Sequence, residues 1–169
     1  MTRRAGENGE VGSDEMDAVN RVRDALLAAS HEDSIQSFAT GTRSAADAAA
    51  SVGCEVAQIA KSIVFRAGDM PVVVVASGAN RIDRKKVAAA TGLVVKPAEP
   101  VWVHERTGFA VGGVAPVGHA CPVTVVIDAD LLPLDPLWAA AGSPSHVFRT
   151  SAQKLISLTG GQVADVRQD

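Results

Sequence analysis

Two strand-like segments joined by a short turn constrain the fold of this 169-residue chain more than any other feature. The segments KSIVF at 61–65 and PVVVVAS at 71–77 are rich in β-branched residues, and RAGDM between them is a hairpin signal. A connection of this length makes the two strands antiparallel neighbours. The centre of the chain therefore favours a mixed, largely antiparallel sheet over a doubly wound parallel one.

Helix and strand patterns alternate on both sides of this hairpin. Ser44 and Asp83 stand at helix N-cap positions, and Gly53 and Gly92 stand where those helices are expected to end. Helices are predicted over 14–30, 44–53, 83–92, 99–108 and 151–161, and further strands over 34–41, 93–95, 122–128, 146–151 and 162–166. The proline-containing segment before 146 is predicted to be a loop. The fold class is thus α/β mixed (α+β): a largely antiparallel, curved central sheet with helices packed around it.

Composition and charge limit the domain organisation and the partners. Residues 1–13 are rich in Gly, Glu and Arg without an apolar period, which predicts a disordered tail, and 14–169 has the length of a single domain. The net charge of −3 excludes strong, unselective binding to nucleic acid. We expect a cytoplasmic protein with reduced thiols at Cys54 and Cys121, because the chain shows neither a secretory signal nor an apolar run that could span a bilayer.

The segment GGVAPVG at 112–118, called the glycine-rich loop below, places three glycines and a proline in seven residues. Glycine lets the backbone approach a ligand closely, and Pro116 fixes its own φ and restricts Ala115. Such a loop can present N–H groups to a carbonyl oxygen or an oxyanion. A tight connection between two strands explains the same composition, and composition alone favours that simpler explanation. The loop is neither a Walker A nor a GxGxxG motif.

Lys61 is the second unusual feature. In a strand, its side chain shares a face with Ile59, Ile63 and Phe65. A charged ammonium group on an apolar face is costly unless it has a partner or a chemical role. The alternative is a lysine at a strand end whose stem packs while its charge reaches water. Spacing alone does not decide between the two.

A basic cluster follows the hairpin. Arg81, Arg84, Lys85 and Lys86 lie within six residues, against the single acidic residue Asp83. At the start of a helix these charges oppose the helix dipole, which suggests a task such as contact with the phosphates of a nucleic-acid end. A solvated basic face is the commoner outcome for such a cluster.

Two smaller groups suggest other chemistry. Ser143 and His146 form a Ser/His pair, but no GxSxG motif accompanies it, so a conventional serine hydrolase is not expected. His119 and Cys121 form an isolated HxC pair without further ligands at zinc-like spacing, so no metal site is expected.

Four segments, taken in order, resemble the YbaK/prolyl-tRNA-synthetase-associated editing domain family over residues 36–166. They are RSAADAAASVGCEVAQIAKSIVF (43–65), NRIDRKKVAAATG (80–92), TGFAVGGVAPVG (107–118) and AAGSPSHVFRTSAQKLISLTG (140–160). By this resemblance Lys61 matches the hallmark lysine of the family, residues 112–116 match its GxxxP loop, and Gly118 follows in the usual place.

The resemblance implies hydrolysis of the ester that links an amino acid to the 3′-terminal adenosine of a mischarged tRNA, by water or by a group of the substrate, without metal or cofactor. The expected partners are aminoacyl-tRNA and, as a further candidate, an aminoacyl-tRNA synthetase, with no membrane. The implied catalytic residues are Lys61, Gly112, Gly113 and Pro116, the implied substrate-binding residues are Ser62, Val114, Ala115, Gly118, Phe38 and His146, and the implied tRNA-binding residues are Arg81, Arg84, Lys85 and Lys86.

Two other functions stay open at this point. The first is an inactive module of the same fold that binds tRNA or a synthetase without cleaving an ester. The intact lysine and glycine-rich loop argue against it, because a decayed site would have lost one of them. The second is a hydrolase of unrelated small esters, which would cleave simple esters as fast as aminoacyl-tRNA.

Overall fold

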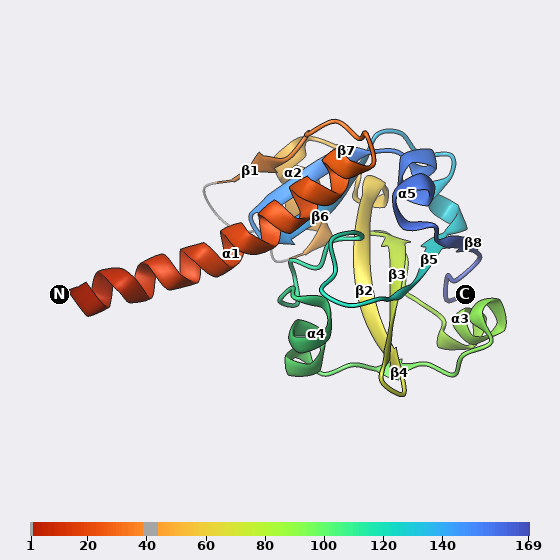
Figure 1. Cartoon of the computed structure of the whole chain (residues 1–169). Coiled ribbons are helices and arrows are strands. Elements are labelled where there is room, and N and C mark those ends of the chain that lie inside the picture. Colours follow the sequence, from red (N-terminus) through yellow and green to blue (C-terminus); the bar gives the residue numbers. More distant parts are fainter. Residues whose placement is uncertain (1, 39–43) are drawn as a thin grey trace.

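The predicted hairpin forms the middle of a β-sheet in the computed structural model, which describes residues 2–38 and 44–169 (Figure 1). Strands β2 (Ile59–Ala67) and β3 (Met70–Ser77) pair antiparallel along their whole length. The other described strands are β1 (Gln36–Ser37), β4 (Lys96–Pro97), β5 (Thr124–Asp128), β6 (Leu137–Ser143), β7 (His146–Thr150) and β8 (Gln162–Ala164). Their order is β1-β7-β6-β2-β3-β5-β8, and β4 also pairs with β2.

Parallel and antiparallel pairs occur in this one sheet, so the predicted mixed α/β fold is confirmed. The antiparallel pairs are β1–β7, β6–β7, β2–β3 and β2–β4. The parallel pairs are β2–β6, β3–β5 and β5–β8. Parallel neighbours need long connections, and helices lie within the connection from β3 to β5. Because β3 and β5 are parallel, their carboxyl ends lie side by side at the same edge of the sheet.

The helices begin and end largely where the capping residues predict. They are α1 (Thr2–Ala28), α2 (Ala45–Val52), α3 (Arg84–Thr91), α4 (Pro100–Thr107) and α5 (Ala152–Thr159), with short 3₁₀ helices η1 (Val56–Gln58) and η2 (Ala129–Leu131). The Ser44 side chain accepts a hydrogen bond from the Asp47 N–H, and Asp83 accepts one from the Lys85 N–H. Each bond satisfies a backbone donor at a helix start that would otherwise lack a partner.

Three boundaries differ from the prediction. Residues 93–95 form no strand, and the short β4 follows them. The predicted strand 34–41 is reduced to β1, and its residues 39–41 lie outside the described residues. Helix α1 begins at Thr2, so the backbone of 2–13 continues a helix where composition predicts a disordered tail. Once a helix is nucleated, each further residue adds a hydrogen bond at little extra cost.

Strand β6 is missing from the sequence-based prediction. Its residues, LWAAAGS, show no alternation of apolar and polar side chains. The reason is that β6 lies between β2 and β7 and is buried along nearly its whole length. A strand buried on both faces has an apolar run instead of a period of two.

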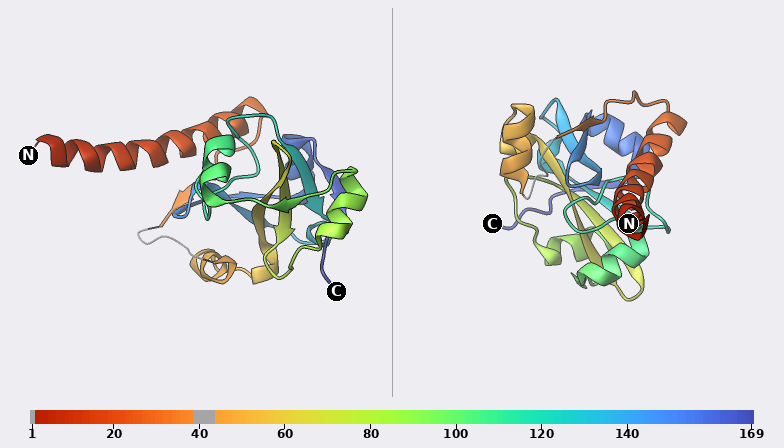
Figure 2. Two further views of the ribbon diagram at one scale, coloured as in Figure 1. Left: turned by 90° about the horizontal axis from the view of Figure 1, so that it is seen from below. Right: turned by 90° about the vertical axis from the view of Figure 1, so that its left-hand side faces the viewer.

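Helices cover both faces of the sheet. Val22 and Leu26 of α1 and Leu155 of α5 pack in one core cluster with Val73 and Val75 of β3. On the opposite face are a cluster that includes α3 and another that includes α2. Figure 2 shows α1 and α2 on opposite sides of the sheet, with the first part of α1 projecting from the body. In the described part of the chain, no helix is long and apolar enough to cross a membrane.

Candidate active site

A cavity of about 240 Å³ opens beside β2, where the pairing partner of this strand changes. On this edge, β2 pairs with β6 at Ile59 and Ala60, and with β4 at Phe65 and Arg66. Between them, residues 61–64 pair with no described strand on this edge. The lining residues are Ser44, Ala45, Ala48, Ile59, Ala60, Lys61, Ser62, Gly112, Val114, Trp138, Ala139, Ala140, Ser143, His146 and Val147. The cavity is thus walled by β2, β6, β7, α2 and the glycine-rich loop.

Lys61 lies in β2 opposite Ala76 of β3, is half-buried, and lines this cavity. It forms no ion pair with any residue that the structure describes. Burial lowers the pKa of its ammonium group from the ordinary value of 10.5, the positive charge of Arg81 lowers it further, and the Asp128 carboxylate raises it. A partly desolvated cation without a fixed partner is available to an anionic group or to a developing negative charge.

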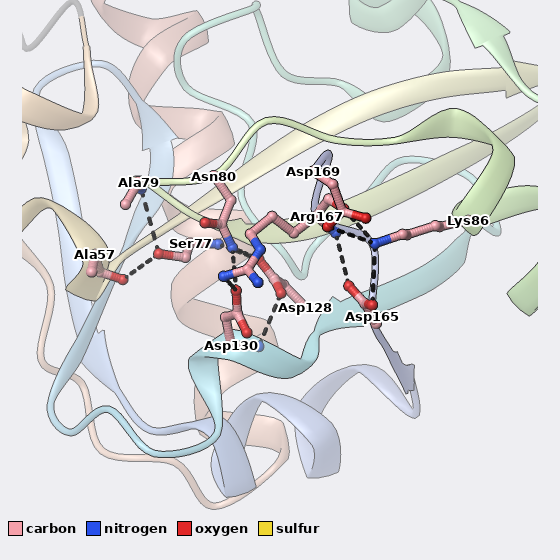
Figure 3. Close-up of polar contacts among 10 residues, drawn as sticks. All are labelled: Ala57, Ser77, Ala79, Asn80, Lys86, Asp128, Asp130, Asp165, Arg167 and Asp169. Atoms are coloured by element: carbon pink, nitrogen blue, oxygen red, sulfur yellow. Dashed lines mark hydrogen bonds and ion pairs between the residues drawn. The ribbon is translucent and has the colours of Figure 1, made fainter.

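Asp128 supplies the fixed negative charge in this region (Figure 3). It ends β5 and is 1% exposed. Its Oδ2 accepts hydrogen bonds from the Ser77 N–H at 3.1 Å and from Asn80 Nδ2 at 2.8 Å, and its Oδ1 accepts one from the Asp130 N–H at 2.9 Å. These bonds hold the carboxylate between the ends of β3 and β5. It therefore acts on Lys61 through space, without an ion pair that would have to break before a substrate binds.

The glycine-rich loop reaches the cavity through Gly112 and Val114. Gly112 has a φ of 96°, in the region that favours glycine. The Gly113 N–H donates to the Ala110 carbonyl at 3.0 Å, and a Cβ on Gly113 would come within 2.7 Å of the Ser143 Cα. No hydrogen bond joins the Gly112 and Val114 N–H groups to described residues. Because Gly112 and Val114 line the cavity, their N–H groups, and not that of Gly113, are the candidate donors to a ligand.

Ser143 and His146 meet in the lining of the cavity, next to the glycine-rich loop, with Oγ and Nδ1 2.6 Å apart. Ser143 Oγ also accepts a hydrogen bond from the Ser145 N–H at 3.1 Å, and it lies 3.3 Å from the Ser145 Oγ. Burial lowers the pKa of His146 below its ordinary 6.5; the Glu15 charge raises it and the Arg23 charge lowers it. The lowered pKa favours the neutral imidazole of His146 at neutral pH.

Ser62 contributes a polar atom without a partner. Its Oγ is buried and forms no hydrogen bond within the described part of the chain. Leaving a buried hydroxyl without a partner costs about 1–3 kcal/mol. Because Ser62 lines the cavity, a ligand group that hydrogen-bonds to this hydroxyl would recover that free energy.

Several residues that the sequence predicts for the site come together in this cavity, and others lie beside it. Lys61, Ser62, Gly112, Val114 and His146 are among its lining residues. The remaining predicted residues of the loop, Gly113, Ala115, Pro116 and Gly118, are not; the first three are buried behind the lining. Phe38 packs on the cluster of Ile59, Trp138 and Val147, next to the cavity but outside its lining.

The basic cluster divides into two parts. Arg81, Arg84 and Lys85 are exposed and form no ion pair with described residues. Lys86 instead contacts the C-terminal segment: its Nζ lies 3.2 Å from Asp165 Oδ2 and donates to the Arg167 carbonyl at 2.7 Å (Figure 3). The hydrogen bond with Asp165 raises the pKa of Lys86. Arg81 is the member whose charge reaches Lys61.

Sequence reasoning missed the contributions of β6 and of Asp128. Trp138 and Ala139 line the cavity because β6 pairs with β2 at this point, and β6 itself was not predicted. Asp128 carried a usable signal, since a polar residue at the carboxyl end of an apolar strand, VVID, marks an edge where functional groups gather. Among the described residues, no group of three His, Cys, Asp or Glu side chains is arranged to hold a metal ion.

Two curated relatives are similar to this chain over most of its length. YwhH of Bacillus subtilis, an uncharacterized protein, is 31% identical over 140 residues, 82% of this chain and 89% of the relative. EbsC of Enterococcus faecalis, a candidate Cys-tRNA(Pro)/Cys-tRNA(Cys) deacylase, is 28% identical over 127 residues, 73% of this chain and 76% of the relative.

Solved structures agree with these relatives. A candidate trans-editing enzyme for prolyl-tRNA synthetase superposes with a TM-score of 0.84 at 40% identity, covering 90% of this chain and 98% of that chain. The hypothetical protein APE2540 superposes with a TM-score of 0.82 at 28% identity, covering 88% of this chain and 99% of that chain. The family model described as "Aminoacyl-tRNA editing domain" matches residues 39–158. The chain therefore belongs to the aminoacyl-tRNA editing domain family.

Proposed function

We propose that the protein is a trans-editing hydrolase that cleaves the 3′-ester bond of mischarged aminoacyl-tRNA at the cavity beside β2. The observation that carries the proposal is the shared position of Lys61 and Gly112, two residues distant in sequence, in the lining of one cavity. Family membership supports the substrate class, because editing domains act on aminoacyl-tRNA. The protein would act as a free-standing unit, like the candidate trans-editing enzyme that it resembles.

The reaction needs stabilisation of negative charge. Water attacks the ester carbonyl carbon, its proton passes to a hydroxyl of the substrate or to solvent, and the carbonyl oxygen becomes an oxyanion. The C–O bond to the ribose then breaks, the ribose oxygen takes the proton that the water gave up, and the free amino acid and tRNA with a free hydroxyl are released. The Gly112 and Val114 N–H groups and the Lys61 ammonium group are the donors for that oxyanion, and Ser62 Oγ is an additional polar contact for the substrate.

The size and walls of the cavity support a small aminoacyl group. A volume of about 240 Å³ is below the ~300–1,000 Å³ that is common for small-molecule sites. Ala48, Ile59, Trp138 and Val147 make much of the lining apolar. His146 lines the same cavity, and we propose that it contacts the polar part of the aminoacyl group. We therefore propose removal of small amino acids and exclusion of large ones by the walls.

The decisive experiment is a panel of tRNAs acylated with Ala, Cys, Ser, Thr or Pro, offered to the wild-type protein. We expect at least one ester to be cleaved well above its spontaneous rate, and simple esters to be cleaved far more slowly. If tRNA binds in a gel shift while no ester of the panel is cleaved, the hydrolase proposal is wrong and a binding module takes its place.

The acidic limb of the pH profile should depend on His146. Because burial lowers its pKa, the neutral imidazole persists down to pH values below 6.5. Protonation below the lowered pKa places a cation in the lining of the cavity, where it would repel the α-ammonium group of the substrate, so kcat/KM should fall. We expect the His146→Gln variant to lose this limb, after subtraction of spontaneous hydrolysis. An unchanged limb in His146→Gln would assign it to another group.

The exposed members of the basic cluster should govern tRNA affinity. Replacing Arg81, Arg84 and Lys85 together by Gln should raise KM, leave kcat nearly unchanged, and reduce the salt dependence of kcat/KM by about 0.7–0.9 log units per lost phosphate contact. Lys86→Gln should instead lower Tm, because Lys86 holds the C-terminal segment. Arg149→Gln, which removes an exposed charge that contacts Glu32, serves as the control. An unchanged KM in the triple variant would move the tRNA contact elsewhere.

A further inference from the structure

Arg21 of α1 joins two points of the chain on either side of the cavity-lining residues. Its Nη2 donates to the Gly108 carbonyl at 2.5 Å, and its Nε donates to the Gly118 carbonyl at 3.4 Å. Gly108 ends α4, and Gly118 is the last residue of the glycine-rich loop. One guanidinium group therefore closes the segment 108–118, which contains Gly112 and Val114.

The Arg21 side chain also packs against an aromatic ring of the same segment. The Arg21 guanidinium lies over the Phe109 ring, 5.1 Å from its centroid, and Phe109 is fully buried. The edge-on partner of that ring is His119, whose Nε2 lies 2.8 Å from the Ala115 carbonyl. Cation–π contact and hydrogen bonds thus hold the same segment from two sides.

The α1 backbone also limits where this segment can lie. A Cβ on Gly118 would come within 3.1 Å of the Arg21 carbonyl oxygen, and a Cβ on Gly142 would come within 2.8 Å of the Ala18 carbonyl oxygen. Both glycines have a positive φ, 81° and 100°. Helix α1 is therefore in close contact with the end of the loop and with the end of β6, next to Ser143.

We propose that Arg21 is a positioning residue that holds the segment 108–118, and with it the Gly112 and Val114 N–H groups, at the cavity. The catalytic task of these N–H groups rests on the proposed function, whereas the positioning of segment 108–118 by Arg21 does not. Arginine suits this task because its planar fork of donors reaches two carbonyl oxygens at once, which a lysine ammonium on its flexible stem does not do in the same geometry. Helix α1 is on this account part of the active-site framework.

The test compares Arg21→Lys with Arg23→Lys, both of which keep the charge of α1. Arg23 lies on the same helix but bonds Asp33 at 2.8 Å and Asn20 at 3.1 Å, away from the segment. Hydrogen–deuterium exchange of amides 109–118, thermal unfolding, and kcat and KM on the acylated tRNA that the wild type cleaves fastest are measured for both. Arg21→Lys should exchange faster in 109–118 and lose about 10-fold in kcat with KM nearly unchanged, whereas Arg23→Lys should match the wild type.

Two outcomes would overturn the inference. The first is wild-type exchange over 109–118 in Arg21→Lys, whatever its rate. The second is a loss of rate that only follows the fraction of folded protein, which would make the role of Arg21 structural. If the wild type cleaves no ester of the panel, the proposed function fails, and the exchange measurement alone still decides whether Arg21 holds the segment.

Discussion

Replacing Lys61 by Ala should slow deacylation about 100- to 1,000-fold, the range seen when one oxyanion-stabilising group is removed from an enzyme. Lys61 lines the cavity, and it has no ion partner among the described residues to compete with a substrate. Its charge is partly desolvated, which strengthens its interaction with an oxyanion. The loss should appear mainly in kcat, measured as single-turnover cleavage of the best ester of the panel.

Stability should not follow this loss of activity. The pKa of Lys61 is lowered, so its charged form destabilises the folded state at pH 7, and that cost disappears as the pH rises from the lowered pKa toward 10.5. Lys61→Ala removes the cost, and its Tm should therefore not fall by more than about 4 °C. Lys154→Ala, at an exposed lysine, is the matched control and should keep full activity. A Lys61→Ala variant that is folded and fully active would exclude this lysine from the reaction.

Of the glycine-to-alanine substitutions in the glycine-rich loop, Gly113→Ala should reduce activity the most. The added Cβ would lie 2.7 Å from Ser143 Cα, 2.9 Å from its carbonyl carbon and 3.0 Å from its nitrogen, and backbone atoms cannot turn aside as a side chain can. Overpacking of this kind costs about 1–3 kcal/mol. Relief of the clash must separate the loop from the end of β6, which displaces Gly112 relative to His146. We expect at least about a 10-fold loss of kcat.

The Gly68→Ala variant separates the loss of stability from the loss of activity expected for Gly113→Ala. Gly68 lies in the turn between β2 and β3 with a φ of 63°, and an added Cβ would meet nothing within 4 Å. An alanine there carries backbone strain of about 1–3 kcal/mol and lies outside the cavity lining. Both variants should lose Tm, and only Gly113→Ala should lose activity. Equal activity in the two would show that the contact between the loop and Ser143 does not matter for catalysis.

The sequence predicted the elements that local rules control. The hairpin of β2 and β3 follows from two β-branched runs and a short turn, and helices α2 and α3 follow from their N-cap residues and closing glycines. It failed at β6, because burial on both faces removes the alternation that marks a strand. It also gave no information on the pairing of β2 with β6, which creates the cavity, because register between distant strands is not encoded locally.

The candidate site shows the same division. Lys61 and the glycine-rich loop are predictable from the sequence because each departs from local patterns. Lys61 is a charge within an apolar strand, and the loop is a group of glycines between apolar segments. The loop composition alone favoured a simple connection. Tertiary structure decided which glycine is most restricted sterically: it is Gly113, through the Ser143 backbone, whereas a Cβ on Gly112 would meet only Pro144 Cγ, at 3.8 Å.

By itself, the sequence determined the fold class, the family and the two residues most unusual for their surroundings, because propensity, capping and motif order are properties of short segments. Tertiary structure alone decided that Lys61 and Gly112 share a cavity, that His146 is held by Ser143, and that Lys86 is engaged with the C-terminal segment. It also decided that α1 reaches the loop through Arg21. These are contacts between residues far apart in the chain, and their geometry is set by strand register and helix packing, which no short segment specifies.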